Sequence, residues 1–196
     1  MAKQERASRT HERFLDASAD EFSRHGYAGA NLQRIAAHVG MTKGALYAHF
    51  PSKGALAAEF TSSFDQVGHK LLQEIGEGDP PLTSLRHVTV GFVHRMQSDL
   101  RFRAGLRLTF EEACSQGRVP AVITELSAAL TRLIGDAQDN DELTTRQRPE
   151  LISSLVVTLM CGMHYIAPLP APANGLGDNT EQVCQIWQLL SSRDMA

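Results

Sequence analysis

The sequence has few of the residues that mark metal-binding, redox or membrane proteins. Its 196 residues include three cysteines, Cys114, Cys161 and Cys184, which lie far apart and form no Cys-x-x-Cys pair. This spacing favours free thiols in a reducing compartment. No apolar run reaches the roughly 18 to 20 residues of a membrane span, and the polar start lacks the apolar core of a signal peptide. We therefore expect a cytoplasmic protein.

Signatures of catalysis are also missing. The sequence contains no GxSxG, HExxH, P-loop or GxGxxG element, so no nucleophile, zinc site or phosphate-binding loop is predicted. His87 and His94 share a helix face, but two helical turns separate them by about 10.5 Å, too far to chelate one ion. We expect no enzyme activity, no metal and no cofactor.

Charge is unevenly divided along the chain. The net charge is −3, which by itself argues against a nucleic-acid partner. Residues 1–53, however, hold eight Lys+Arg against five Asp+Glu, whereas residues 54–196 hold 11 against 17. The N-terminal segment is therefore net basic (+3) and the rest net acidic (−6). This division indicates that only the N-terminal segment meets a polyanion.

Apolar residues recur at spacings of three and four, and the eight prolines lie between such segments or at their edges, which predicts an all-α chain. Gly26 is expected to end the first helix, and Gly76, Gly78, Pro80 and Pro81 to separate an N-terminal from a C-terminal part. The linkers are 138–148 and 167–178. We expect helices at 8–25, 32–39, 42–50, 52–75, 82–97, 100–115, 120–137, 149–166 and 179–192.

The second and third helices have the layout of a helix-turn-helix. Asn31 and Thr42 are good N-caps, Gly40 permits the turn, and Met41 is expected to fill the space between the two helices. The first turn of the third helix combines free backbone N–H groups, a hydroxyl, a cation and small side chains, which suits close approach to a DNA groove. The candidate DNA-binding residues are Asn31, Gln33, Thr42, Lys43, Gly44, Ala45, Tyr47, His49 and Lys53.

The stretch NLQRIAAHVGMTKGALYAHFPSK, from Asn31 to Lys53, resembles the DNA-binding signature of the tetracycline-repressor (TetR) family. The likeness covers residues 5–64. It implies a helix-turn-helix DNA-binding head at 1–53, a connecting helix at 54–78 and a helical effector-binding and dimerisation body at 79–196. It further implies a dimeric repressor that binds palindromic operator DNA and is released by a small apolar molecule.

A narrower likeness points to the gamma-butyrolactone receptor branch of that family. The segments AKQERA, GYAGA, TKGALY and RAGLRL resemble this branch. Its receptors are known for a tryptophan that covers the ligand on the helix after RAGLRL, whereas residues 119–133 contain no aromatic residue. We therefore expect weak or no response to gamma-butyrolactones, and either a bulkier apolar effector or none.

Two further sets of residues are predicted in the C-terminal part. The last two helices are amphipathic and are expected to form a four-helix interface in a homodimer. Two alternatives to a DNA-binding repressor stay open: a helical interaction module that binds no DNA, and a cryptic enzyme acting on a small molecule. Neither alternative requires the polar face at 42–49. The candidate effector-binding residues are Phe92, His94, Met96, Leu106, Thr109, Phe110, Met160 and Met163. The candidate interface residues are Leu155, Leu159, Met160, Val183, Ile186, Trp187 and Leu190.

Overall fold

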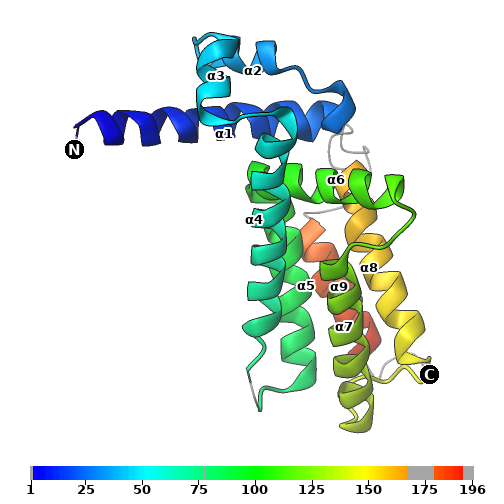
Figure 1. The fold of residues 1–196 in the computed structure, drawn as a ribbon. Coiled ribbons are helices and arrows are strands. Elements are labelled where there is room, and N and C mark those ends of the chain that lie inside the picture. The colour runs from blue at the N-terminus through cyan, green and yellow to red at the C-terminus, as the bar shows by residue number, and fades with distance from the viewer. Residues whose placement is uncertain (1, 77, 167–178, 192–196) are drawn as a thin grey trace, which may run out of the picture. The chain divides into compact units, whose positions relative to one another are not determined.

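A computed structural model describes residues 2–76, 78–166 and 179–191 (Figure 1). Within these residues all regular secondary structure is helical, which confirms the predicted fold class. None of the helices there is long and apolar enough to cross a membrane. The helices are α1 (Ala2–Gly29), α2 (Leu32–His38), α3 (Lys43–His49), α4 (Lys53–Gln73), α5 (Pro81–Ser98), α6 (Leu100–Ser115), α7 (Ala121–Asp139), α8 (Pro149–Ile166) and α9 (Asn179–Ser191).

Most helix boundaries agree with the prediction to within a few residues, but α1 differs. It begins at Ala2 rather than Ser8, and it continues to Gly29 across a kink at Gly26. Gly26 has φ 65° and ψ −175°, so it interrupts the helix geometry without ending the segment. The linker predicted at 167–178 lies outside the described residues.

The chain packs as two units. Unit 1 comprises Met1–Gln66 and Asp99–Pro120, and unit 2 comprises Val67–Ser98 and Ala121–Ala196. Helix α4 contributes to both, and α6 belongs to unit 1. The Gly/Pro-rich break at 76–81 therefore joins two helical segments of the same unit, because such a break ends a helix without specifying which helices pack together. The functional division at residues 53 and 78 stays a proposal.

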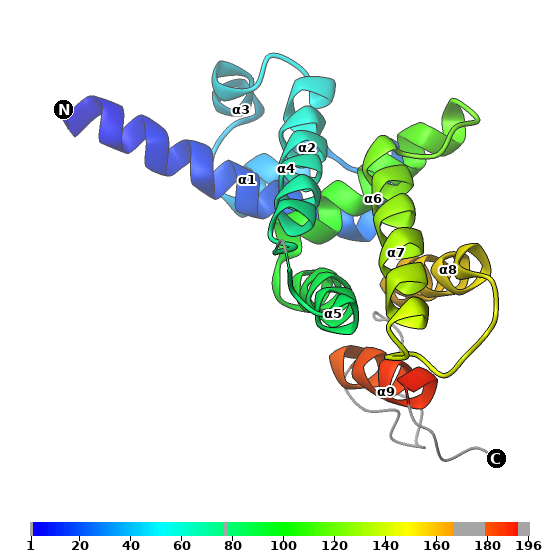
Figure 2. The same ribbon diagram turned by 90° about the horizontal axis from the view of Figure 1, so that it is seen from below.

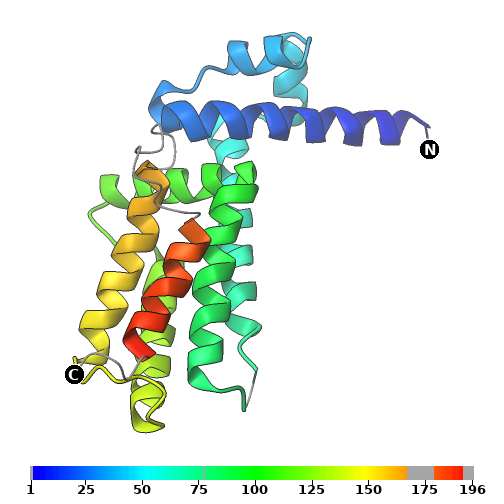
Figure 3. The ribbon, with the colours of Figure 1, turned by 180° about the vertical axis from the view of Figure 1, so that it is seen from behind.

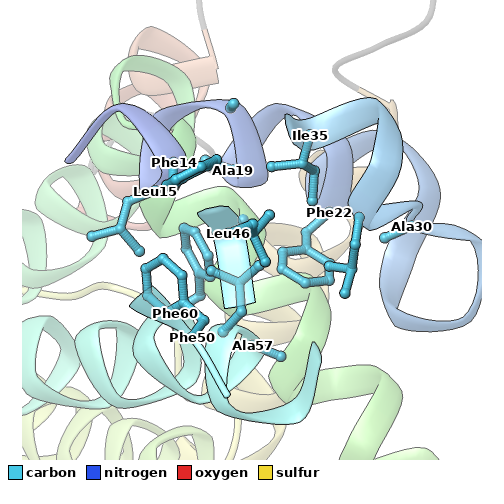
Figure 4. Packing of buried hydrophobic residues seen from close by; sticks show 14 of the residues in the cluster. Phe14, Leu15, Ala19, Phe22, Ala30, Ile35, Leu46, Phe50, Ala57 and Phe60 are labelled. Atoms are coloured by element: carbon cyan, nitrogen blue, oxygen red, sulfur yellow. The ribbon is translucent and has the colours of Figure 1, made fainter. Parts of the chain in front are cut away.

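The core of unit 1 is built by large apolar side chains of α1, α3 and α4 (Figure 4). Phe14 and Phe22 of α1 and Leu46 of α3 are fully buried, and Phe22 meets the ring of Phe60 edge-on at 5.6 Å. Gly105 lets α6 approach α4 closely, since a Cβ there would collide with the Phe60 carbonyl. Unit 1 thus gives the short helices α2 and α3 a rigid support, which helices of seven residues need.

Unit 2 contains α5, α7, α8 and α9. Figures 2 and 3 show α9 beside α5 and α8 beside α7, and α5 also packs on α7. Trp187 of α9 is fully buried and donates its indole N–H to Thr89 Oγ1 of α5 at 2.9 Å. The Thr89 hydroxyl in turn donates to the Leu85 carbonyl at 2.7 Å. This chain of two hydrogen bonds satisfies the indole N–H inside an apolar interior.

Candidate nucleic-acid interface

The turn between α2 and α3 is closed by backbone hydrogen bonds. Gly40 N–H donates to Ala37 O and Met41 N–H to Ala36 O, both at 2.9 Å, which is the Schellman pattern. Gly40 has φ 74°, a left-handed conformation that glycine adopts without strain. Thr42 then caps α3, because its Oγ1 accepts from Ala45 N–H at 3.2 Å. The sequence-predicted turn and cap are therefore confirmed.

Helix α1 holds this turn in place. The Arg13 guanidinium donates to the Val39 carbonyl at 2.8 Å, and the His11 ring stacks on Phe50 with ring centroids 4.6 Å apart. His49, a predicted DNA contact, packs its half-buried ring near His11 and against Phe14, with centroids 5.9 and 5.6 Å away. His49 therefore helps to dock the end of α3 on α1. Its role as a DNA contact stays a prediction.

The outer face of α3 is exposed. Thr42, Lys43, Gly44 and Tyr47 all lie on the surface, and the Lys43 ammonium is 5.7 Å from the centre of the Tyr47 ring. Met41 is 38% exposed and so does not fill the space between α2 and α3 as predicted. The left-handed Gly40 turns the chain outward at this point, and Leu46 and Ile35 supply the buried contacts instead.

Gly44 has no packing reason to be a glycine. A Cβ at this position would meet only Thr42 Oγ1, at an ordinary contact distance of 3.7 Å. In the middle of a helix glycine costs roughly 0.5–1 kcal/mol relative to alanine, and Gly44, in the first turn of α3, costs up to that amount. The fold of unit 1 would therefore be more stable with alanine here. The bare backbone at Gly44 suits a requirement from outside the chain, such as close approach of a DNA strand.

The start of α2 is fixed by a buried carboxylate. Asn31 Oδ1 accepts from Gln33 N–H at 2.8 Å, while Glu21 accepts from Asn31 N–H at 2.8 Å and pairs with Arg34. Burial opposes ionisation of Glu21, but the hydrogen bonds from Arg34 and Asn31 outweigh it and hold the pKa of Glu21 below its usual value. Asn31 and Gln33 both remain exposed, as a contact to DNA requires.

Lys53 has an intramolecular role that its predicted DNA contact does not include. Its ammonium donates to the Ala30 carbonyl at 2.7 Å and to the Ala28 carbonyl at 3.4 Å, and it lies 5.0 Å from the centre of the Tyr27 ring. A lysine side chain beside the C-terminal end of a helix can satisfy the last carbonyls of that helix in this way. Lys53 therefore ties the start of α4 to the end of α1.

Sequence reasoning missed His11, Arg13, Glu21 and Arg34. These side chains position the helix-turn-helix from α1 and α2, yet each resembles an ordinary surface residue in the sequence. Their partners are up to 39 positions away, as with His11 and Phe50. No local pattern signals such pairs. An acid inside the apolar face of α1, as at Glu21, was the only available clue.

The predicted effector-binding residues do not all lie together. Phe92, Met96, Met160 and Met163 are buried in unit 2, whereas His94 is exposed and does not join them. Residue 94 follows residue 92 by about 200° around α5, which turns it to the opposite face. Leu106, Thr109 and Phe110 lie on α6 in unit 1. The Thr109 hydroxyl is buried and has no hydrogen-bond partner among the described residues.

The predicted dimer residues divide in the same way. Met160, Val183 and Trp187 are buried within unit 2, so their side chains cannot meet a second chain, and we remove them from the interface. Ile186 and Leu190 are partly exposed. Leu155 and Leu159 are exposed, and Leu151 precedes them by one turn, so a row of exposed leucines runs along α8 at positions i, i+4 and i+8.

No metal site emerges from the part of the chain described, and one of its thiols is partly buried. No three His, Cys, Asp or Glu side chains there are grouped to hold an ion. Burial raises the pKa of the Cys161 thiol to about 11, which keeps it protonated at neutral pH.

A capped helix-turn-helix with an exposed polar second helix defines a DNA-binding unit. Residues 14–60 match the family described as "Bacterial regulatory proteins, tetR family". The chain is 29% identical over 194 residues to the A-factor receptor protein of Streptomyces griseus, covering 96% of this chain and 64% of that protein. It thus spans less than two thirds of that relative's length.

Solved structures give a comparison of the fold over nearly the whole chain. A gamma-butyrolactone receptor described as ArpA-like is similar with a TM-score of 0.74 and 26% identity, over 94% of this chain and 87% of that one. CprB from Streptomyces coelicolor, solved in complex with its biological operator sequence, is similar with a TM-score of 0.72 and 30% identity, over 94% and 88%. The chain belongs to the TetR family of bacterial regulatory proteins.

Proposed function

We propose that this chain is a transcriptional repressor that binds palindromic operator DNA as a homodimer and is released by a small apolar effector. The observation that carries the proposal is the exposed face of α3, where Gly44 leaves the backbone bare although the fold does not need it. The similarity to CprB, solved with its operator, supports the same reading. Since operator DNA lies in the bacterial cytoplasm, the proposal places the protein there. It includes no catalytic role.

Recognition is assigned to the first turn of α3 and its neighbours. Lys43 and Tyr47 lie on one exposed face, and Thr42 has a hydroxyl proton that its capping bond does not use, so these residues can read base edges or bind phosphate. Asn31 and Gln33 can add phosphate contacts from the start of α2. In a twofold dimer the two α3 helices meet half-sites about 34–36 Å apart, or a multiple of that distance.

The dimer interface is assigned to the leucine row of α8, which comprises Leu151, Leu155 and Leu159. These side chains are among the large apolar groups that stay exposed in one chain. Leu189 of α9 is exposed as well. Burying an exposed leucine contributes about 1.5–3 kcal/mol, and a twofold axis counts each residue twice. A helix pair from each subunit then gives a four-helix interface.

The effector is assigned to the interior around Phe92, Met96, Met160 and Met163. Helix α7 offers only aliphatic side chains to its buried face. Because residues 119–133 carry no aromatic lid, we expect no release of operator DNA by nanomolar gamma-butyrolactones. A titration panel of gamma-butyrolactones and larger polyketides checks this, and release by a nanomolar lactone would contradict it.

The operator is found by selecting bound fragments from random DNA, and variants then test the face of α3. Gly44→Ala should raise the free energy of unfolding by up to about 1 kcal/mol while weakening operator binding. Gly135→Ala is the matched control, because its Cβ would also meet one atom at an ordinary distance, Pro149 Cγ at 3.8 Å. It should stabilise the chain and leave operator affinity unchanged.

Lys43→Ala tests how the face reads DNA. If Lys43 contacts guanine, the variant should lose about 1–3 kcal/mol of binding and relax a base preference. If Lys43 contacts phosphate, binding should weaken equally on all sequences and depend less on salt. Lys70→Ala removes the same charge from α4 in unit 2 and should bind operator normally. Recovery of an asymmetric consensus with a single half-site would contradict the dimeric mode.

A further inference from the structure

A groove of about 690 Å³ opens within unit 1, and the proposed function does not use it. Its walls are the last residues of α1, the first turns of α4 and the last turns of α6. None of the residues predicted to contact an effector lines it. The lining residues that carry the argument are Tyr27, Ala57, Ala58, Leu108, Glu111 and Glu112.

The groove is open because α4 presents very small side chains to it. Gly54, Ala57 and Ala58 end at Cα or Cβ, so no side chain of that helix fills the space between α1 and α6. Leu108 and Ala57 are buried members of the hydrophobic core, and the groove reaches them. Its inner surface is therefore apolar, and an apolar molecule that displaces water from it gains free energy.

The outer edge of the groove is acidic. Glu111 is fully engaged, because it accepts from Tyr27 N–H at 2.6 Å and from Arg107 at 2.8 Å. Glu112 is more exposed: about half of its side chain faces solvent, while its Oε1 accepts from Gln116 Nε2 at 3.1 Å and lies 3.8 Å from the Arg118 guanidinium. A second cation can approach the Glu112 carboxylate. No lysine or arginine is among the residues that line the groove.

The other polar groups add acceptors. The Ser115 hydroxyl donates to the Glu112 carbonyl at 2.7 Å, and the Thr61 hydroxyl donates to the Ala58 carbonyl at 3.3 Å. Both hydroxyl protons are thereby used, so these groups present lone pairs to the groove. The groove combines an apolar floor with two carboxylates and acceptor atoms among its lining residues. The cations nearby are already bound, Arg107 and Arg118 to these carboxylates and Lys53 to backbone carbonyls, so the groove suits a positive ligand better than a negative one.

We infer that this groove is a second small-molecule site, specific for an amphipathic cation: an apolar ring system that carries an ammonium or iminium group. The apolar body lies over Ala57, Ala58 and Leu108, and the charge lies beside Glu112. The site is in the DNA-binding unit, separate from the effector interior assigned to unit 2. It does not depend on the proposed repressor function, since binding is measured without DNA.

Rhodamine 6G is a suitable probe because it is an apolar cation, and fluorescein is its matched anion on the same xanthene ring. Fluorescence anisotropy of each dye is measured with the full chain. Ala58→Leu/Thr61→Leu fills the groove from α4 without changing charge. Glu112→Gln removes the half-exposed charge at the edge. Asp136→Asn is the control, because Asp136 makes a similar exposed ion pair, with Arg132 at 3.7 Å.

Rhodamine 6G should bind, and fluorescein should bind more weakly. The groove-filling variant should lose at least about tenfold in affinity, and Glu112→Gln about 1.4- to fivefold, the range of one exposed ion pair. Asp136→Asn should bind normally. Circular dichroism of each variant verifies its fold, and Glu112→Gln, a surface change, tests the site even if the double variant unfolds. Absence of rhodamine binding, equal binding of both dyes, or full affinity in the folded filled variant would overturn the inference.

Discussion

The buried hydrogen bond between Trp187 and Thr89 gives a sharp test of how unit 2 is held together. Both side chains are fully buried, and Thr89 Oγ1 is the acceptor for the indole N–H at 2.9 Å. Thr89→Val keeps the shape but leaves that N–H without a partner. An unsatisfied buried donor costs about 1–3 kcal/mol, so the variant should lose that much stability.

A double-mutant cycle separates this hydrogen bond from simple packing. Trp187→Phe removes the N–H, so Thr89→Val should cost less in that background, with a coupling of about 1–2 kcal/mol. Urea unfolding is followed by circular dichroism for all four proteins. Since Trp187 is the sole tryptophan, its fluorescence also reports unit 2 in the two proteins that keep it.

Thr131→Val serves as the control for this cycle. The Thr131 hydroxyl donates to the Ser127 carbonyl of its own helix at 2.8 Å, as Thr89 does to Leu85, but Thr131 is only half-buried. Loss of this hydroxyl should cost less than about 0.5 kcal/mol, because a Thr hydroxyl bonded to the i−4 carbonyl of its own helix adds little stability. If Thr89→Val costs no more than this control, or costs the same with and without Trp187, the hydrogen bond does not hold α9 on α5.

Three other predictions follow from burial and charge. Leu155→Arg should yield folded monomers in sedimentation, because Leu155 is 61% exposed in one chain. Met160→Arg should instead unfold unit 2, because Met160 is 1% exposed. Dimers that persist in Leu155→Arg would show that the interface does not include Leu155. Glu21 has a lowered pKa, so its stabilisation is present above its ordinary value of 4.5 and is lost as pH falls through the folded pKa; Glu21→Gln should therefore flatten the loss of melting temperature on acidification. Tyr47→Phe should weaken operator binding by no more than about 3 kcal/mol, the limit for one hydroxyl contact, as measured by gel shift.

The helix-turn-helix could be predicted because local interactions define it. Asn31 caps a residue two positions away, Thr42 caps one three positions away, and the Gly40 turn is closed within five residues. Such contacts depend on neighbours in the sequence, so residue type and spacing are enough to identify them. The same holds for Ser52, which caps α4 through Ala55 N–H at 2.9 Å.

The inner face of α8 could not be predicted, for a physical reason. Apolar residues surround much of this helix, with Leu151, Leu155 and Leu159 on one side and Val156 and Met160 on another. Hydrophobic periodicity identifies an apolar stripe but cannot decide which of two stripes packs within the chain. The choice depends on the surface of α7, where Ser127 accepts from Ser153 at 2.9 Å and fixes the rotation of α8.

Gly26 combines a local signal with a constraint from far along the chain. Its φ of 65° marks a break in α1, which sequence reasoning anticipated as a helix end. A Cβ there would also collide with the Glu111 carboxylate of α6. That carboxylate accepts from Tyr27 N–H and from Arg107, and Arg107 also donates to the Ser23 carbonyl at 2.9 Å. A side chain at Gly26 would therefore displace the Glu111 carboxylate from Tyr27 N–H and from Arg107. The glycine is needed first for the left-handed turn, and it also leaves room for the Glu111 carboxylate that holds the end of α1 on α6.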